Sequence, residues 1–182
     1  MKAVGVIVAI DPGKATGLAI GSVWRKPAGV EIDEEGAITH RLFTKYAVKL
    51  HRFDTLSFEH VYTDLLPNMQ YADSLGKTLD VPVKLVGEAF IITNTAQRGA
   101  STWSLEVIGG SKALVDTNFA DWLPYDFSQK SGDAKTVMTN TVLKDCKLTS
   151  KDMECKLTPH VQDAMRHLLL HVSRVQTKKT TL

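Results

Sequence analysis

The stretch VGVIVAIDPGKATGLAI, residues 4–20, contains two strand patterns separated by a turn. Residues 4–10 are an uninterrupted apolar run rich in β-branched side chains, which is typical of a strand buried on both faces. Residues 11–17, DPGKATG, carry a proline and two glycines that permit a tight reversal of the chain. The reversal leads into a second strand at residues 18–24, so we predict that the two strands are antiparallel neighbours in one sheet.

Further helical and strand patterns follow along the chain. After an exposed loop at 25–36 we expect a strand at 37–48, a helix from Thr55, a strand at 81–88, a helix at 101–123 and a final helix from Pro159 to Val175. Pro67 should end or kink the helix that starts at Thr55. Residues 124–157 are polar, and we expect a short strand, a basic loop and a short helix there.

These patterns predict an α/β fold of one domain over residues 1–182. Three antiparallel strands followed by helix-linked parallel strands make a five-stranded mixed sheet flanked by helices. Asp11 ends the first strand and Glu88 ends the fourth. If these two strands run parallel and adjacent, both carboxylates lie at the edge where ligands collect in such sheets.

Composition narrows the class of protein. A chain of 182 residues with 43% apolar residues suits a single core, and the absence of an 18-residue apolar run or a leader pattern predicts a cytoplasmic protein. Cys146 and Cys155 match no zinc-site spacing and suit a reducing compartment. The net charge of +2 does not by itself indicate nucleic-acid binding, and the lysine-rich segment 130–156 reads more readily as a solvated face than as a phosphate-binding strip.

The final helix carries two stripes of side chains. Thr158 can cap this helix and Pro159 can occupy its first turn. The apolar stripe should dock on the sheet; it comprises Val161, Ala164, Met165, Leu168 and Val172. The polar stripe comprises His160, Asp163, His167 and His171. We interpret the last two histidines as residues of the polar helix face.

Three blocks of the sequence together resemble a known family. They are IVAIDPGKATGLAI at 7–20, VGEAF at 86–90 and HVQDAMRHLLLH at 160–171. Their order and character are similar to the signature blocks of RuvC-type Holliday-junction resolvases, which belong to the ribonuclease H-like superfamily. The sequence DAMRH in the last block looks most like the versions carried by bacteriophages. The resemblance covers the core from about Val4 to Val172.

This resemblance implies a metal-dependent endonuclease that resolves Holliday junctions by paired symmetric nicks. Two divalent ions, Mg²⁺ or alternatively Mn²⁺, assist in-line phosphodiester hydrolysis and take hard oxygen ligands. In the implied site Asp11 bridges both ions, while Glu88 and Asp163 each serve one. His160 occupies the fourth position, where it either binds an ion or accepts the proton of the attacking water.

The resemblance also assigns residues to DNA. Lys130 and Lys135 lie where the family places lysines that approach the scissile phosphate or the backbone. Phe90 resembles an aromatic wedge at the junction centre, with a buried core position as its alternative, and Asn94 resembles a nearby polar contact. The resemblance places two further phosphate contacts at Lys14 and Arg98.

The expected partners are a four-way junction or other branched DNA, and a second copy of the chain. Because a junction has two-fold symmetry, a two-fold dimer presents two active sites to opposed strands. Gly109 and Gly110 favour the helix at 101–123 as the dimer face, although an intramolecular contact would use the same glycines.

Other functions fit parts of the pattern. A sugar-kinase or actin-like ATP-binding domain also has an Asp-x-Gly loop near its first strand, but it needs a duplicated second domain for which 182 residues leave no room. A YqgF-like nuclease that processes RNA remains an alternative, as does a junction-binding protein that has lost catalysis. The expected setting is a bacterial or phage-infected host cell.

Overall fold

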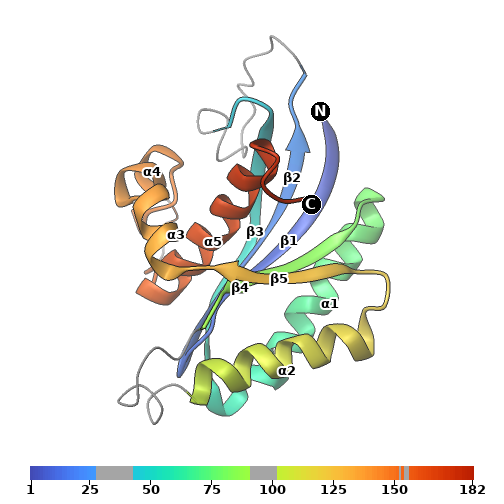
Figure 1. Cartoon of the computed structure of the whole chain (residues 1–182), viewed down its shortest axis with the longest axis vertical. Helices are drawn as coiled ribbons and strands as arrows, with labels where there is room; N and C mark the ends of the chain where they lie inside the picture. Colours follow the sequence, from blue (N-terminus) through green and yellow to red (C-terminus); the bar gives the residue numbers. More distant parts are fainter. Residues whose placement is uncertain (28–42, 91–101, 152, 154–155) are drawn as a thin grey trace.

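The computed structural model describes residues 1–27, 43–90, 102–151, 153 and 156–182. Its centre is a five-stranded mixed sheet in the order β3-β2-β1-β4-β5 (Figure 1). The strands are β1 Lys2–Asp11, β2 Ala15–Arg25, β3 Tyr46–Ser57, β4 Val83–Glu88 and β5 Leu123–Gln129. This sheet confirms the predicted fold class.

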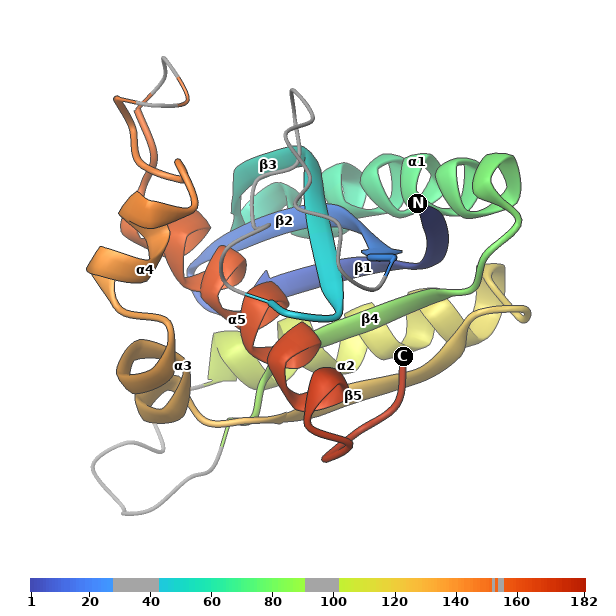
Figure 2. The same ribbon diagram turned by 90° about the horizontal axis from the view of Figure 1, so that it is seen from above.

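Helices cover both faces of the sheet (Figures 1 and 2). A 3-10 turn, η1 Phe58–His60, leads into α1 Val61–Leu79, and this helix and α2 Thr102–Asn118 pack on one face. The other face is covered by α3 Ser131–Val137, α4 Asn140–Asp145 and α5 Pro159–Gln176. Successive side chains of a strand point to opposite faces, so Ile7 enters the α5 side of the core and Val8 enters the α1 side. The apolar run of β1 is therefore buried on both faces, as predicted.

The strand pairing brings two carboxylates to one edge. β1 and β2 are antiparallel, with Asp11 opposite Gly17. β1 and β4 are parallel, with Ile10 beside Gly87. Asp11 and Glu88 are the next residues along their strands and therefore lie at the same end of the sheet.

The third strand was predicted too early in the chain. Residues 37–42 of the predicted strand lie outside the described residues, and β3 runs from Tyr46 to Ser57. It pairs with β2 along its whole length, from Tyr46 beside Arg25 to Ser57 beside Ala15. Main-chain pairing with a central strand holds its polar second half extended, and α1 consequently begins at Val61 rather than at Thr55.

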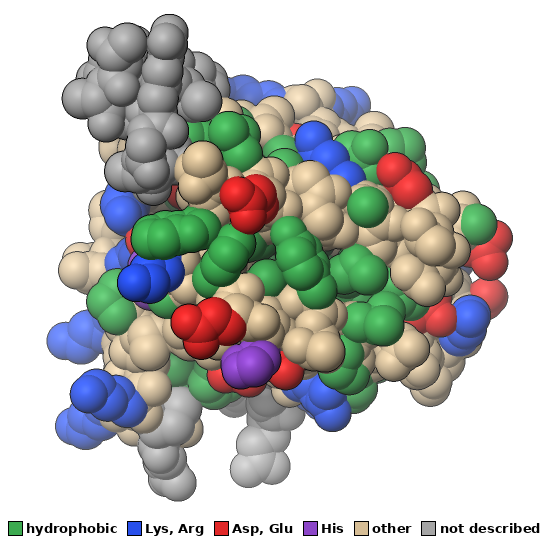
Figure 3. All heavy atoms as spheres, turned by 90° about the horizontal axis from the view of Figure 1, so that it is seen from below, with side chains coloured by type: hydrophobic (Ala, Val, Ile, Leu, Met, Phe, Trp, Pro, Cys, Tyr) green, Lys and Arg blue, Asp and Glu red, His purple; other side chains and the backbone are tan. Residues whose placement is uncertain are grey.

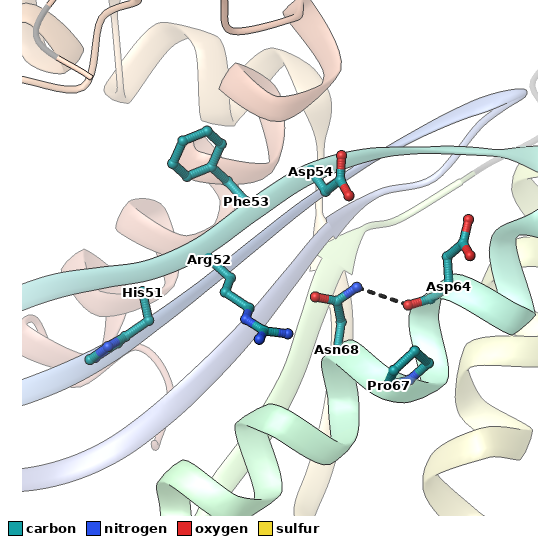
Figure 4. A pocket seen from close by; sticks show the side chains of 7 residues that line it. All are labelled: His51, Arg52, Phe53, Asp54, Asp64, Pro67 and Asn68. Atoms are coloured by element: carbon teal, nitrogen blue, oxygen red, sulfur yellow. Dashed lines mark hydrogen bonds between the residues drawn. The ribbon is translucent and has the colours of Figure 1, made fainter. Parts of the chain in front are cut away.

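We expected Pro67 to end or kink the helix. It does not end α1, which runs on to Leu79. The helix continues for three turns beyond this proline, because Leu65 and Met69 on either side are fully buried in the core. Figure 4 shows Pro67 in the groove between α1 and β3, where the Asn68 amide donates a hydrogen bond of 2.8 Å to the carbonyl oxygen of Asp64.

Helix α2 ends at Asn118, earlier than predicted, and its two glycines differ in environment. A Cβ atom on Gly110 would lie 2.1 Å from the ring of Tyr62 on α1, so this glycine permits close intramolecular packing. A Cβ atom on Gly109 would meet nothing within 4 Å. Among the described residues, no helix is both long and apolar enough to cross a membrane.

Candidate metal centre

Asp11 lies at the end of β1, where α5 approaches the sheet. Its carboxylate oxygen Oδ2 is 3.0 Å from Nδ1 of His160, and its side chain is 12% exposed against 46% for that histidine. The helix that carries His160 begins with the predicted cap, because the Thr158 hydroxyl accepts a hydrogen bond from the amide of Val161 at 3.2 Å. The same threonine hydroxyl lies 2.6 Å from that of Thr55 on β3. These contacts fix the first turn of α5 beside Asp11.

Gly17 makes this approach of helix to sheet sterically feasible. A Cβ atom at this position would lie 1.9 Å from the carbonyl oxygen of His160 and 2.9 Å from the amide nitrogen of Val161. Both are backbone atoms that cannot rotate away. Gly17, the second glycine of the DPGKATG segment, therefore sets the distance between α5 and β2.

Glu88 ends β4 and faces the same cluster. Burial raises the pKa of Glu88 to about 7, and the negative charge and hydrogen bond of Asp11 add to this effect. Burial also raises the pKa of Asp11, while the hydrogen bond from His160 opposes the increase. Two carboxylates that share a partly desolvated site resist simultaneous ionisation unless positive charge is supplied.

Asp163 lies one turn into α5 and contacts two cations. Its Oδ2 atom is 3.0 Å from Nζ of Lys135, and its Oδ1 atom accepts a hydrogen bond from the guanidinium of Arg166. Arg166 is buried, and it also donates to the carbonyl oxygen of Met138 at 3.0 Å and to the side chain of Asn140. The guanidinium thus orients Asp163 and connects α5 to the segment that joins α3 and α4.

His167 does not lie on an exposed helix face, so our interpretation of this residue was wrong. Its side chain is 1% exposed, with Nδ1 3.1 Å from Oε1 of Gln129 on β5 and Nε2 4.0 Å from Oε2 of Glu88. Burial lowers the pKa of His167 to about 4. The imidazole is therefore neutral near pH 7.

His171, one turn further along α5, is also buried rather than exposed. Its side chain is 0% exposed, and Nδ1 lies 3.5 Å from the Oδ2 atom of Asp126 on β5. The proximity of this imidazole lowers the pKa of Asp126 well below its usual range. The two histidines are buried because α5 crosses the sheet diagonally towards β4 and β5 and has α3 packed against its side (Figure 2).

The donor set fits a divalent cation. Ligand atoms from Asp11, Glu88 and His167 all lie within 4.8 Å of one another. A bound cation would stabilise the ionised form of these two carboxyl groups, whose pKa values are raised in its absence. Carboxylate oxygens are also ligands of Mg²⁺ and Mn²⁺. His160 and Asp163 flank the cluster through their contacts with Asp11 and Lys135. Of the four predicted metal ligands, only Asp11 and Glu88 belong to this group of ligand atoms. His160 contacts Asp11, and the charge of Asp163 is close enough to raise the pKa of both carboxyls.

The structure describes four of the six residues that were predicted to contact DNA. Lys135 is exposed and contacts Asp163, whereas Lys130 is exposed at the start of α3. Lys14 lies in the β1–β2 turn with Nζ 5.1 Å from the ring centroid of Trp103. Phe90 is half-buried just beyond β4. The remaining two predicted contacts, Asn94 and Arg98, lie outside the described residues.

Sequence reasoning missed three residues that shape the site. Gln129 orients His167, Arg166 orients Asp163, and Ser104 donates a hydrogen bond of 2.9 Å to the carbonyl oxygen of Pro12, which ties α2 to the β1–β2 turn. The role of His167 at the site was also missed. The sequence did carry a signal for it, since positions 160, 163 and 167 share one helix face. No local pattern identified Gln129, because its partner is 38 residues away.

The fold has counterparts among solved structures. RuvC from Thermus thermophilus is similar, with a TM-score of 0.54 and 14% sequence identity over 95% of this chain and 96% of that chain. T. thermophilus RuvC in complex with a Holliday junction substrate also matches, with a TM-score of 0.48 and 13% identity over 94% and 95% of the two chains. No protein-family model matches the chain, and no curated protein matches it by sequence. The first likeness establishes a RuvC-like, ribonuclease H-like fold.

Proposed function

We propose that this protein is a Mg²⁺-dependent endonuclease that cuts branched DNA at four-way junctions, leaving paired symmetric nicks. The observation that carries the proposal is the meeting of Asp11 and Glu88 at one sheet edge, with His160 against Asp11 and the charge of Asp163 acting on both carboxyls. The RuvC-like fold and the three sequence blocks support it, because the blocks supply these four residues. The expected setting is the cytoplasm of a bacterial or phage-infected cell.

Each site residue has a proposed role. Asp11 would serve both divalent ions, Glu88 would serve one of them, and Asp163 would serve the other. Bound ions supply the positive charge that stabilises the phosphodiester during in-line displacement. Nδ1 of His160 lies against Asp11, which leaves Nε2 of this half-exposed ring to accept the proton of the attacking water, with direct ion binding as the alternative.

Exposed lysines around the cluster are suited to hold the DNA. We propose that Lys135, rather than Lys130, lies nearest the scissile phosphate, because Lys135 contacts Asp163 and lowers the pKa of Glu88 electrostatically. In this proposal Lys130 and Lys14 contact the DNA backbone on either side of the scissile phosphate. Phe90 and Asn94 remain proposed contacts at the junction centre, and Arg98 remains a proposed phosphate contact.

A homodimer through α2 would place two such sites on one junction. Figure 3 shows a band of apolar side chains across the face of the molecule that carries α1 and α2. Trp103 and Leu105 at the start of α2 are 38% and 42% exposed, and Tyr62 on α1 is 39% exposed. Gly109 faces open space, so a second copy can approach α2 closely at this point. We propose this surface as the two-fold contact.

A cleavage assay with matched substrates tests the proposal. The protein is incubated with a synthetic four-way junction, a linear duplex of the same sequence, a flap and a single-stranded RNA, each with Mg²⁺ or with EDTA. Symmetric Mg²⁺-dependent nicks in the junction alone support junction resolution. Equal cutting of the flap broadens the activity to general debranching, and cutting of RNA alone supports the YqgF-like alternative. Junction binding without any nicking supports the inactive binding protein.

A further inference from the structure

We propose that His167 is a nitrogen ligand of the ion held by Glu88 and Asp11, that Gln129 positions it, and that this site consequently prefers Mn²⁺ to Mg²⁺. The inference rests on the proposed function, since it requires the cluster to bind a divalent ion. It adds a fifth ligand to the four carried by the family resemblance. The resemblance itself gives no role to the residue four positions after Asp163.

The position of His167 is the first argument. The ring is 1% exposed and lies beneath the carboxylate cluster, with its Nε2 atom 4.0 Å from Oε2 of Glu88. This separation exceeds hydrogen-bond distance, so the two atoms do not satisfy one another directly. A ring nitrogen of His167 also belongs to the group of ligand atoms from Asp11, Glu88 and His167 that lie within 4.8 Å of one another. A small adjustment of these side chains would let one ion bond to His167 and to the carboxylates.

The orientation of the ring is the second argument. Nδ1 of His167 lies 3.1 Å from the amide oxygen of Gln129, a fully buried residue at the end of β5. An amide oxygen only accepts hydrogen bonds, so Nδ1 carries the proton and Nε2 presents a lone pair towards Glu88. Ligating histidines in proteins characteristically donate their other ring N–H to an oxygen acceptor in this way. Gln129 is thus a positioning residue.

The chemistry of the donor predicts the metal preference. Mg²⁺ favours oxygen ligands and loses its water reluctantly, whereas imidazole suits transition metals. A buried neutral imidazole beside two carboxylates therefore adds affinity for Mn²⁺ while adding little for Mg²⁺. A purely structural role, in which His167 only ties α5 to β5, would produce no such discrimination.

Metal binding to the full chain without DNA tests this inference. Free Mn²⁺ is measured by electron paramagnetic resonance, and Mg²⁺ affinity is obtained by competition. We expect Mn²⁺ to bind the parent protein at least about tenfold more tightly than Mg²⁺. His167→Gln should weaken Mn²⁺ binding by about tenfold or more, with Mg²⁺ binding changed by less than about threefold, and Gln129→Met should weaken Mn²⁺ binding in the same direction.

His171→Gln is the matched control, since it alters an equally buried histidine of the same helix that lies beside Asp126 instead of the cluster. It should leave binding of both ions unchanged. A direct readout on the unaltered protein does not depend on the folding of any variant: in ¹⁵N-histidine spectra, Zn²⁺ should shift the Nε2 resonance of His167 while Nδ1 keeps its proton.

Two results separate the possible failures. If the parent binds both ions but His167→Gln binds Mn²⁺ as tightly, or loses both ions equally, the role of His167 is overturned while the proposed function stands. If the parent binds neither ion, the metal-dependent function itself is overturned.

Discussion

At the scale of single residues, Gly17 shows how a turn motif acts on a distant helix. Its substitution by alanine puts a Cβ atom into the backbone of His160. We expect Gly17→Ala to reduce the free energy of unfolding by about 3 kcal/mol or more, because backbone atoms cannot move aside as a side chain can. Urea denaturation measures this change.

Gly132→Ala is the control for this substitution. The alanine Cβ atom on α3 would meet nothing within 4 Å, so the free energy of unfolding should change by less than about 1 kcal/mol. Equal effects of the two alanines would show that Gly17 does not set the position of α5.

The raised pKa of Glu88 predicts a pH dependence of stability in the metal-free protein. The folded protein holds the Glu88 proton up to about pH 7, whereas the unfolded chain releases it near 4.5. This proton's contribution to stability is therefore complete below pH 4.5 and is lost as pH rises through 7. Glu88→Gln cannot ionise, so its stability relative to the parent should increase between pH 5 and pH 8.

The expected size of this change is on the order of 1–2 kcal/mol, reduced from the full value because the Glu88 carboxyl is partly solvated. Urea denaturation in EDTA at the two pH values measures it. The low pKa of His167 affects parent and variant alike, and so it largely cancels in the comparison. A stability difference that does not change with pH would contradict the desolvation of Glu88.

At the scale of elements, Arg166 holds the short helices α3 and α4 against α5. Its guanidinium donates hydrogen bonds to the Met138 carbonyl oxygen, to Asn140 and to Asp163. Met138 is only 2% exposed. Replacing Arg166 by methionine removes the guanidinium donor from the Met138 carbonyl oxygen and from Asn140, and leaves Asp163 with Lys135 as its remaining cation. We expect Arg166→Met to cost about 3 kcal/mol of unfolding free energy.

Arg174→Ala provides the comparison, since this arginine is also on α5 and contacts Asp133 at 3.5 Å in a more exposed pair. Its loss should cost less than about 1 kcal/mol. Thermal denaturation of both variants measures the difference, and similar losses would mean that Arg166 has no special role in docking α3 and α4.

The elements also show where sequence reasoning succeeds. β1, the turn after Asp11, β4 and the start of α5 were predicted because each carries a local signal: an apolar run, turn residues, or a capping threonine before a proline. The polar segment His51–Thr55 gave no strand signal, because its extended conformation depends on pairing with β2. Likewise the burial of His167 and His171 depends on α3 and β5, which no period within α5 reveals.

At the scale of the whole molecule, the surface around α2 carries the prediction of a dimer. Leu105→Asp places a charge at the centre of the proposed contact and should convert the protein to monomers in sedimentation velocity experiments. Val137→Asp, on α3, changes a side chain that is 48% exposed and lies away from this surface, and it should leave the assembly unchanged. A parent protein that is monomeric at all concentrations would contradict the proposed contact.

The candidate site as a whole was predictable to the extent that three separated sequence blocks each contain at least one candidate ligand. The structure adds what the blocks lack: the Asp11–His160 contact, the two cations on Asp163, and the imidazole beneath Glu88. These depend on side chains meeting across three elements. Spacing along one chain does not report such contacts.

The central claim is that the acidic cluster cuts branched DNA, and Asp11→Asn tests it most directly. The variant keeps the size of the side chain but removes a charge that no neighbouring residue replaces. With a synthetic four-way junction and Mg²⁺, we expect Asp11→Asn to bind the junction as the parent does in a gel-shift assay and to lose at least about 10³-fold in cleavage rate. Asp64→Asn, an exposed acid on α1 across the sheet, should cut at the parent rate. Junction cleavage by Asp11→Asn at the parent rate would contradict the account.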